Sequence, residues 1–405
     1  MFERRSSVTR IRILMSLSEM VQIPRLQARR KSVMPAQAGI QCGGGRDHIE
    51  PGFPLSRERR QKNSRPRLDS FKIPRFLAEG CSILALVFGV LPGGSAVLGA
   101  EKLVGLQAAP SIAMALPWFA EEARLYPKYD LDFQLVYIAS SGIVTAAMSG
   151  GSGSVAIAGG EGPIRAFLSG NTDFVFIGSV KNVLTHSIMG KPEIKRPEDL
   201  KGKKIGVGRI GSNSHYYTVY AMRQKGLDPA RDAQFIQTGG APETFQALAS
   251  GAVDAASITT PQDTRAAFLG FNYVIDGREL KPPYVATGFV TLRSVIAKRP
   301  KVISQFIHVM AESLKIMVTD RELAYKIMAK KINLTDRRVF DAAYTVELRV
   351  LEPRFDVKPG AIQATLDEIG RTDPRAAKVS AQQLIDRRFL EEMERDGTFE
   401  RLGLR

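Results

Sequence analysis

Residues 197–217 read PEDLKGKKIGVGRIGSNSHYY, and this stretch decides the fold class. Its apolar segment Lys204–Val207 predicts a short strand. The loop after this strand is rich in glycine, and Ser212, Asn213 and Ser214 are residue types that cap the N-terminus of a helix. A strand, a glycine-rich loop and a helix in direct succession are typical of α/β architecture.

The same alternation continues outward from this unit in both directions. Short apolar strands alternate with helix-length amphipathic segments, which indicates a mainly parallel sheet covered by helices. From Pro300 the pattern is helical, with apolar residues spaced three to four apart over 302–317 and further helices near 320–331, 335–350, 358–370 and 381–396. Strands are predicted at Lys102–Gln107, Phe133–Ile138, Ser154–Ala158, Phe174–Ile177, Lys204–Val207, Gln234–Gln237, Ala255–Ile258, Tyr273–Ile275 and Ala286–Leu292.

Two segments of the chain repeat each other at a distance of 100 residues. Residues 134–159 and 234–259 both predict a strand, a loop of small residues, a helix, a glycine and a second strand, without a gap. A glycine that ends a helix is common in any such unit, but the matched lengths are not explained by it. The repeat therefore predicts two similarly built lobes.

The positive charge is concentrated at the N-terminus. The chain has a net charge of +16, yet residues 1–100 carry 17 Lys and Arg against 7 Asp and Glu, whereas residues 101–405 carry 40 against 34. The two cysteines, Cys42 and Cys81, also lie in the first hundred residues. The remainder of the chain is only mildly basic, so no nucleic-acid partner is expected, and it has no thiol for a disulfide, a nucleophile or a zinc site.

The first hundred residues predict targeting rather than a folded domain. The apolar run 81–91 follows Lys72 and Arg75 and precedes small residues, as in a signal peptide. The run is too short to span a bilayer. We expect a signal peptide over 71–100 with cleavage near Gly99 or Ala100. Residues 1–70 are Arg-rich and aperiodic, which indicates a misassigned start or a disordered extension.

The helix start at 212–215 is the first candidate binding site. Backbone N–H groups and hydroxyls at the N-terminus of a helix bind carboxylates, sulfonates and similar anions, and His215 offers a ring for an apolar part of the ligand. A capped helix without a ligand is the alternative. Other candidate ligand-binding residues follow predicted strands: Pro110, Ser111, Ser140, Ser141, Gly159, Gly160, Glu161, Thr259 and Thr260. For Glu161, an ion pair with Arg165 four residues later is the simpler explanation.

Several chemistries are excluded or disfavoured by the inventory of residues. No cofactor is expected: His186, His215 and His308 have no paired spacing for a metal, and there is no Gly-x-Ser-x-Gly motif. The glycines at 206, 208 and 211 match a dinucleotide fingerprint. However, the next strand, Gln234–Gln237, ends without the acidic residue that would bind a ribose.

The chain resembles the periplasmic substrate-binding proteins of nitrate/sulfonate/taurine-type ABC importers, a superfamily that includes binders of thiamine pyrimidine precursors. The resemblance covers about 102–370 and depends on three motifs: PEDLKGKKIGV at 197–207 with Gly211 and Ser212 after it, GLDP at 226–229, and ALASGAVDA at 247–255. It implies a type II two-lobed α/β fold with two crossover strands near 183–190 and 284–290 and a helical C-terminal segment. The implied boundaries are 101–192 for the first part of lobe 1, 193–283 for lobe 2 and 284–405 for the return to lobe 1.

The resemblance implies a function without catalysis. The chain would be a periplasmic, monomeric protein that captures a small organic ligand, with organic anions among the candidates, between its lobes and delivers it to a permease and its ATPase. An unambiguous anion-clamping arginine is missing from the loops, which argues against nitrate or a small sulfonate. A larger organic ligand fits the glycine-rich loops at least as well. The alternatives are a dinucleotide-dependent oxidoreductase, a pyrimidine-precursor synthase, whose cysteine-rich motif is missing after residue 81, and a sensory input module.

Overall fold

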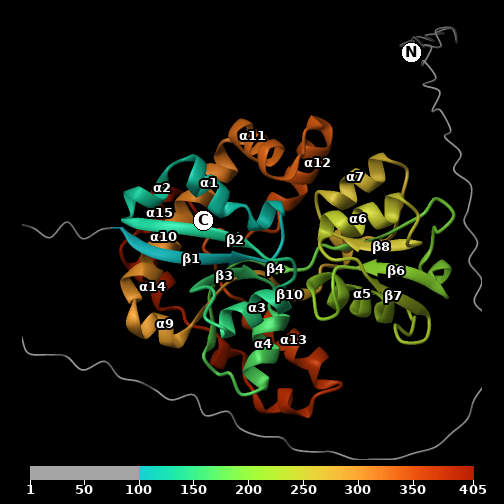
Figure 1. Ribbon diagram of the computed structural model, residues 1–405, viewed down its shortest axis with the longest axis horizontal. Helices are drawn as coiled ribbons and strands as arrows, with labels where there is room; N and C mark the ends of the chain where they lie inside the picture. The colour runs from blue at the N-terminus through green and yellow to red at the C-terminus, as the bar shows by residue number, and fades with distance from the viewer. Residues whose placement is uncertain (1–99) are drawn as a thin grey trace, which may run out of the picture. The chain divides into compact units, whose positions relative to one another are not determined.

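The computed structural model describes residues 100–405 of the chain. The predicted extension over 1–70 and almost all of the predicted signal peptide over 71–100 fall outside the described residues. Within 100–405 the chain forms two five-stranded sheets, each covered by helices, which we call lobe 1 and lobe 2 (Figure 1). This confirms the predicted two-lobed α/β class.

The two sheets have the same strand order and the same directions of pairing. Lobe 1 contains β1 (Glu101–Gln107), β2 (Leu131–Tyr137), β3 (Val155–Ala158), β4 (Phe174–Val183) and β10 (Pro283–Leu292), in the order β2-β1-β3-β10-β4. Lobe 2 contains β5 (Ser187–Gly190), β6 (Lys203–Val207), β7 (Ala233–Gln237), β8 (Ala255–Ile258) and β9 (Asn272–Ile275), in the order β7-β6-β8-β5-β9. In both sheets the first three strands are parallel and the fourth is antiparallel to its two neighbours.

The repeat at a distance of 100 residues is real at the level of structure. Helix α3 (Ser141–Ser149) in lobe 1 corresponds to α6 (Ala241–Ala249) in lobe 2, and β3 corresponds to β8. Gly151 and Gly251 follow the two helices with φ of 78° and 79°, a left-handed conformation that glycine adopts without strain. The matched lengths therefore reflect one structural unit that is used twice.

The chain crosses between the lobes twice, and the two crossings lie side by side. The first runs from β4 through Leu184 to β5, and the second runs from β9 through α8 (Gly277–Leu280) to β10. The backbone N–H of Leu184 donates to the carbonyl of Pro282 at 3.1 Å, which ties one crossing to the other. These paired crossings form the hinge between the lobes.

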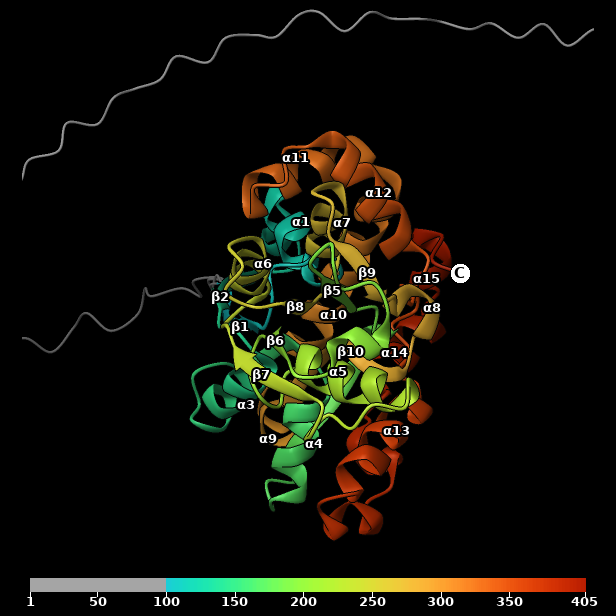
Figure 2. The ribbon, with the colours of Figure 1, turned by 90° about the vertical axis from the view of Figure 1, so that its right-hand side faces the viewer.

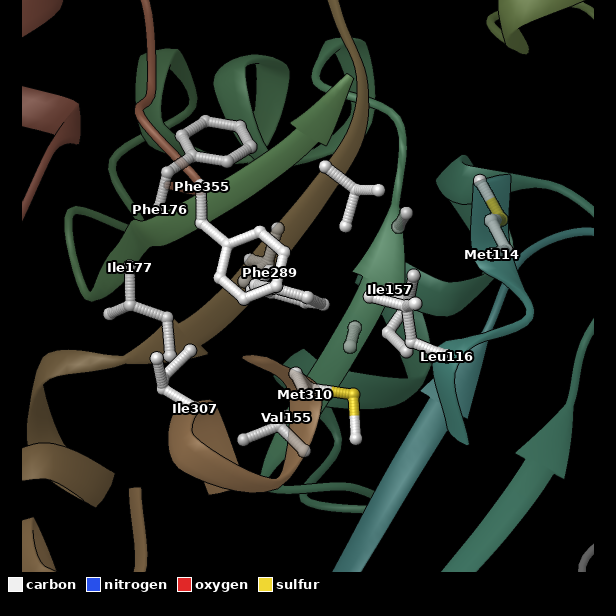
Figure 3. Packing of buried hydrophobic residues seen from close by; sticks show 14 of the residues in the cluster. Met114, Leu116, Val155, Ile157, Phe176, Ile177, Phe289, Ile307, Met310 and Phe355 are labelled. Atoms are coloured by element: carbon white, nitrogen blue, oxygen red, sulfur yellow. The ribbon is translucent and has the colours of Figure 1, made fainter. Parts of the chain in front are cut away.

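A large apolar core holds lobe 1 together. Helix α10 (Pro300–Thr319) is long and apolar enough to cross a membrane, but its apolar stripe is buried against the sheet. Phe289 of β10 makes edge contacts with Phe306 of α10 and with Phe355, at ring distances of 5.6 and 5.1 Å. Figure 3 shows Phe355, Phe289 and Met310 gathered in this core. The lobe 1 helices are α1 (Leu116–Glu122), α2 (Leu125–Lys128), α3, α4 (Glu161–Leu168), α9 (Arg293–Lys298), α10, α11 (Arg321–Ile332), α12 (Arg337–Leu348), α13 (Pro359–Gly370), α14 (Arg388–Arg395) and α15 (Thr398–Leu402).

Contacts between the lobes away from the hinge involve polar or charged side chains. Lobe 2 carries α5 (Asn213–Gln224), α6, α7 (Gln262–Phe268) and α8 around its own apolar clusters. On one side the hydroxyl of Tyr216 donates to the Ala364 carbonyl of α13 at 3.3 Å. On the other side α7 lies against α12, as Figures 1 and 2 both show, and Arg338 stacks over Phe268. Separate cores with a polar interface are typical of domains that move relative to each other.

Three features differ from the sequence-based expectation. Strand β5 is missing from the strands predicted by periodicity, although the resemblance implied a crossover strand near 183–190. It pairs with β8 and β9 and belongs to lobe 2, whereas the expected boundary placed residues up to 192 in lobe 1. Its four residues are all buried and too few to show a period. The helix expected at 381–396 is divided into a 3₁₀ turn at Ala381–Leu384 and α14. The break occurs where Ile385 forms an isolated bridge to Phe176 of β4.

A glycine at the hinge gives the first prediction. A Cβ on Gly277 would overlap the carbonyl oxygen of His186, which belongs to the other crossing. Because that oxygen is backbone and cannot rotate away, we expect Gly277→Ala to lower the free energy of unfolding by about 3 kcal/mol. Gly360→Ala in α13 is the control, since it has no neighbour within 4 Å and should raise stability by about 0.5–1 kcal/mol. Urea unfolding of both variants measures this, and equal stability of the two would contradict the packing at the hinge.

Candidate functional site

A cleft between the lobes collects the loops that follow the parallel strands. Ligands of open α/β sheets bind outside the carboxyl ends of strands, and both sheets direct these ends into the same cleft. Its volume is about 90 Å³, well below the ~300–1,000 Å³ that accommodates a drug-sized ligand. The cleft is lined by Ala108, Ala109, Ser111, Ala113, Met114, Ser140, Ser141, Lys181, Leu184, Thr185, His186, Gly208, Ser212, Asn213, Ser214, Gly239, Gly240, Ala241, Thr244, Ser257, Ile258, Thr259, Thr260, Ala286, Thr287 and Glu347.

Three helices begin at this cleft. The residues at the N-termini of α3, α5 and α6 all line it, with α3 from lobe 1 and the other two from lobe 2. The first N–H groups of a helix have no partner within the helix, and the aligned peptide dipoles place a partial positive charge there. Three such ends around one small cavity favour a ligand with a negatively charged group.

The two serines at the start of α5 form a compact hydroxyl pair. Ser212 Oγ caps the helix by accepting from the N–H of His215, and Ser214 Oγ accepts from the N–H of Gly208 at 2.9 Å. The two hydroxyl oxygens are 3.0 Å apart, so one hydroxyl donates to the other. Each serine has one hydroxyl hydrogen, and one of the two hydrogens is therefore left to donate to a ligand.

The lobe 1 side of the cleft contains a strained serine. Ser140 precedes α3 and has φ of 89° and ψ of 130°, a backbone conformation that residues other than glycine rarely adopt. Its structural counterpart in lobe 2 is Gly240. The neighbouring Ser141 accepts a hydrogen bond from the Gly159 N–H at 2.8 Å. Strain of this kind persists at ligand sites when the surrounding structure enforces it.

The loop after β8 adds two threonines to the cleft. Thr259 and Thr260 both line it, and the Thr260 hydroxyl lies 3.5 Å from the carboxylate of Asp263 behind it. Asp263 is fully buried, and burial raises the pKa of its carboxyl to about 6. The negative charge of Glu347 also raises this pKa, while hydrogen bonds from Thr264 oppose the shift. Asp263 therefore places an acidic group close to the wall of the cleft.

A shared tyrosine hydroxyl connects the lobes behind the cleft. Tyr284 at the start of β10 accepts the N–H of Glu161 at 2.9 Å and donates to Asn213 Oδ1 at 3.0 Å. The amide of Asn213 also donates to the Ala286 carbonyl at 3.0 Å. Asn213 is thus a cleft residue whose amide atoms are already used, and we call the set Glu161, Asn213 and Tyr284 the hinge node.

Five predicted site residues do not line the cleft. Gly159 and Gly160 pack behind it, where a Cβ on Gly159 would meet Asn213 and a Cβ on Gly160 would meet Val285. The Glu161 carboxylate pairs with Arg165 at 2.8 Å, the simpler of the two explanations that the sequence offered. His215 accepts from the Gly211 N–H through Nδ1 and contacts Phe235, and burial lowers its pKa. Pro110 lies at a separate hollow of lobe 1.

The structure brings together the other eight predicted residues. All eight line the cleft, whereas Glu161 and His215 do not. The residues that meet at the cleft come from loops distributed over both lobes: Ser111, Ser140, Ser141, Ser212, Asn213, Ser214, Thr259 and Thr260.

Sequence reasoning missed a buried ion pair in the cleft. Lys181 of β4 and Glu347 of α12 both line it, with 2.6 Å between Nζ and Oε1. Each is an exception in an otherwise apolar pattern: Lys181 follows a run of buried strand residues, and Glu347 continues the buried stripe that contains Phe340 and Tyr344. A charged residue at a position whose period predicts burial is the signal that was available. The hinge residues Thr185 and His186 also line the cleft. They were missed because the short buried segment around β5 is too short to show a period.

The dinucleotide alternative is not favoured by the geometry. A pyrophosphate would have to lie close to the backbone of Gly208. Neighbouring groups already occupy this space, since a Cβ on Gly208 would lie 3.1 Å from the Gly239 carbonyl oxygen and close to the hydroxyls of Ser212 and Ser214. Gln237, at the end of β7, accepts the N–H of Ile210. Asp232 pairs with Arg231 on the loop before β7. Among residues 100–405, no group of three or more His, Cys, Asp or Glu side chains is arranged to hold a metal ion.

The two lobes form the type II periplasmic-binding-protein fold. The NMT1-like family model matches residues 136–333, which include α3, α5 and α6. The matched segment covers just under half of the chain. A search of curated proteins gives no significant match.

Solved structures share the fold at low sequence identity. The alkanesulfonate-binding protein SsuA of Xanthomonas axonopodis pv. citri, bound to MOPS, superposes with a TM-score of 0.60 at 20% identity, covering 71% of this chain and 98% of its own. The periplasmic aliphatic sulphonate binding protein SsuA of Escherichia coli gives 0.56 at 24% identity, covering 71% and 92%.

An enzyme also has this fold. The desulfurization enzyme DszB, solved as a cysteine-to-serine mutant with biphenyl-2-sulfinic acid, gives a TM-score of 0.54 at 14% identity over 73% of this chain and 99% of its own. The fold by itself therefore does not separate binding from catalysis. In this chain both cysteines precede residue 100, so the cleft of the described part contains no thiol.

The strain at Ser140 leads to a prediction about stability. Glycine accepts positive φ without a steric penalty, so Ser140→Gly should raise the free energy of unfolding by about 1 kcal/mol. Ser140→Ala keeps the strained backbone and removes the hydroxyl, and it should leave stability within about 0.5 kcal/mol of the wild type. Thermal and urea unfolding of both variants provide the comparison. A destabilised glycine variant would contradict the strained conformation.

Proposed function

We propose that this chain is the solute-binding component of an ABC importer and that its ligand is a small organic anion. The observation that carries the proposal is the convergence of three helix N-termini from two lobes, with the serine pair of α5, on one small cleft. This arrangement supplies a free hydroxyl hydrogen and N–H groups of the helix starts to a negatively charged group, mainly at α3 and α5, because the Gly240 N–H at α6 already donates to Glu243. The similar proteins described as sulfonate-binding support the same class of ligand.

The hinge supports capture by closure. The lobes have separate apolar cores, are joined by two adjacent crossings and meet elsewhere through polar contacts. A ligand that contacts helix ends from both lobes stabilises the closed arrangement by the difference between its affinities for the closed and open forms. The closed form is then the one that a membrane permease recognises. No bond is made or broken in this account.

Export and partners complete the proposal. Residues 71–100 act as a signal peptide that ends near Gly99 or Ala100, and residues 1–70 are dispensable. The mature protein is a periplasmic monomer that delivers its ligand to a permease powered by an ATPase. A second function, such as an oxidoreductase or synthase, is not supported by the contacts around Gly208 or by the thiol-free cleft.

The serine pair provides the test of this function. Ser214→Ala removes an acceptor for the Gly208 N–H and the hydroxyl hydrogen, and it should weaken binding of the anion by about 1.5–3 kcal/mol, or roughly tenfold to 150-fold. Ser212→Ala should show a similar loss and, because Ser212 caps α5, a loss of about 1 kcal/mol in stability. Calorimetric titration with sulfonates and carboxylates, alongside unfolding midpoints, measures both quantities.

The control is Ser250→Ala, because Ser250 is an exposed serine after α6 whose hydroxyl bonds only the Ala247 carbonyl. It should leave binding unchanged. If no organic anion binds the wild type, or if both cleft variants bind as tightly as the control, the anion site is not at the start of α5.

A further inference from the structure

We infer that the ligand carries an N–H or O–H donor away from its anionic group, and that the buried Lys181–Glu347 pair recognises this donor. The inference rests on the proposed function, because it concerns the second end of the same ligand. It names a class: organic anions with an amino, amide or hydroxyl group on the tail. Anions with a plain hydrocarbon tail are then poor ligands.

The pair lies on the floor of the cleft beside the hinge. Lys181 is on β4 opposite Thr287 of β10, and both residues line the cleft. The ammonium group donates to Thr185 Oγ1 at 2.7 Å and to Glu347 Oε1 at 2.6 Å. An ammonium group has three hydrogens, so one remains after these two bonds. Lys181 therefore holds Glu347 in position and can also donate once to a ligand.

Glu347 offers an unused acceptor at the same place. Its side chain is 3% exposed, and its second oxygen, Oε2, is buried and has no hydrogen-bond partner among the described residues. A buried charged oxygen without a donor is costly, and a donor from the ligand would remove this cost. A hydrocarbon tail cannot do so. The preference for a polar tail follows from this difference.

Stability does not account for the pair. Glu347 lies in the last turn of α12, where the partial negative charge of the helix end disfavours a carboxylate. Replacement of buried ion pairs by apolar residues of similar volume is often neutral or stabilising, so apolar side chains would serve the core of lobe 1 without this cost. A role in recognition explains why a charged pair is buried beside a binding cleft.

The charges around the pair set the sign of the recognised group. Burial lowers the pKa of His186 to about 3, so its ring is neutral, and Lys181 is the cation bonded to Glu347. Asp263 is a second acid close enough for Glu347 to raise its pKa. Arg278, which faces Asp263, forms an ion pair with Asp276. A second anionic group on the ligand would meet two acids here, whereas a donor group is accepted by Glu347.

A matched ligand series tests the inference. Alkanesulfonates and alkanoates of equal chain length are compared with an amino, a hydroxyl or a methyl group at the end of the chain. We expect the amino-ended or hydroxyl-ended member of at least one set to bind the wild type about tenfold or more tightly than its methyl-ended partner, measured by calorimetry. Equal affinity across every set that binds would overturn the inference and leave the proposed function intact. If no member of any set binds, the proposed function fails.

The variant Lys181→Met with Glu347→Leu removes the pair without leaving a lone buried charge. We expect this double variant to keep or raise the unfolding midpoint and to reduce the preference for the polar tail to within about twofold. Lys330→Met with Glu122→Leu is the matched control, since these residues form an exposed ion pair at 2.9 Å on lobe 1, and it should keep the preference. Lys181→Leu with Glu347→Met, which also removes both charges and the acceptor, gives a second readout if the first double variant is unstable. An unchanged preference in a folded variant that lacks the carboxylate would overturn the inference.

Discussion

The arrangement of the cleft depends on one phenolic hydroxyl at the hinge. Tyr284 accepts from the start of α4 in lobe 1 and donates to Asn213 at the start of α5 in lobe 2. Tyr284 is fully buried, and burial raises the pKa of its hydroxyl, so the hydroxyl keeps its proton and remains a donor. This node holds the N-terminus of α5, with its serine pair, next to the strand that connects the lobes. Binding chemistry and hinge geometry are therefore linked at one residue.

The second constraint is the unequal polarity of the cleft. Helix N-termini and hydroxyl groups provide partial positive charge on both lobes, whereas the hinge floor contains the buried Lys181–Glu347 pair. A ligand with a negative head satisfies the first group, and a polar tail satisfies the second. Residues of β4, β10 and the crossing between β4 and β5 line this second region of the cleft. A ligand that occupies both regions therefore lies across the hinge.

The sequence predicted the architecture well because the signals were local. The alternation of strands and helices, the repeat at 100 residues and the capping residues at 212–214 each depend on a few neighbouring residues, and each matches an observed element. The buried pair was not predicted, because it joins two residues separated by 166 positions and only the fold brings them together. Gly159 and Glu161 were expected at the ligand, but their backbone N–H groups donate to Ser141 and Tyr284, which are distant in the sequence, and they lie behind the cleft.

The central claim is that the interlobe cleft retains a small organic anion. It is tested most directly by mass spectrometry of the small molecules released when the protein, purified under native conditions, is denatured. The account predicts one organic anion in roughly equimolar amount from the wild type and a much smaller amount from a variant without the Ser212 and Ser214 hydroxyls. Release of the same molecule in equal amount from that variant, or release of a nicotinamide dinucleotide instead, would contradict the account.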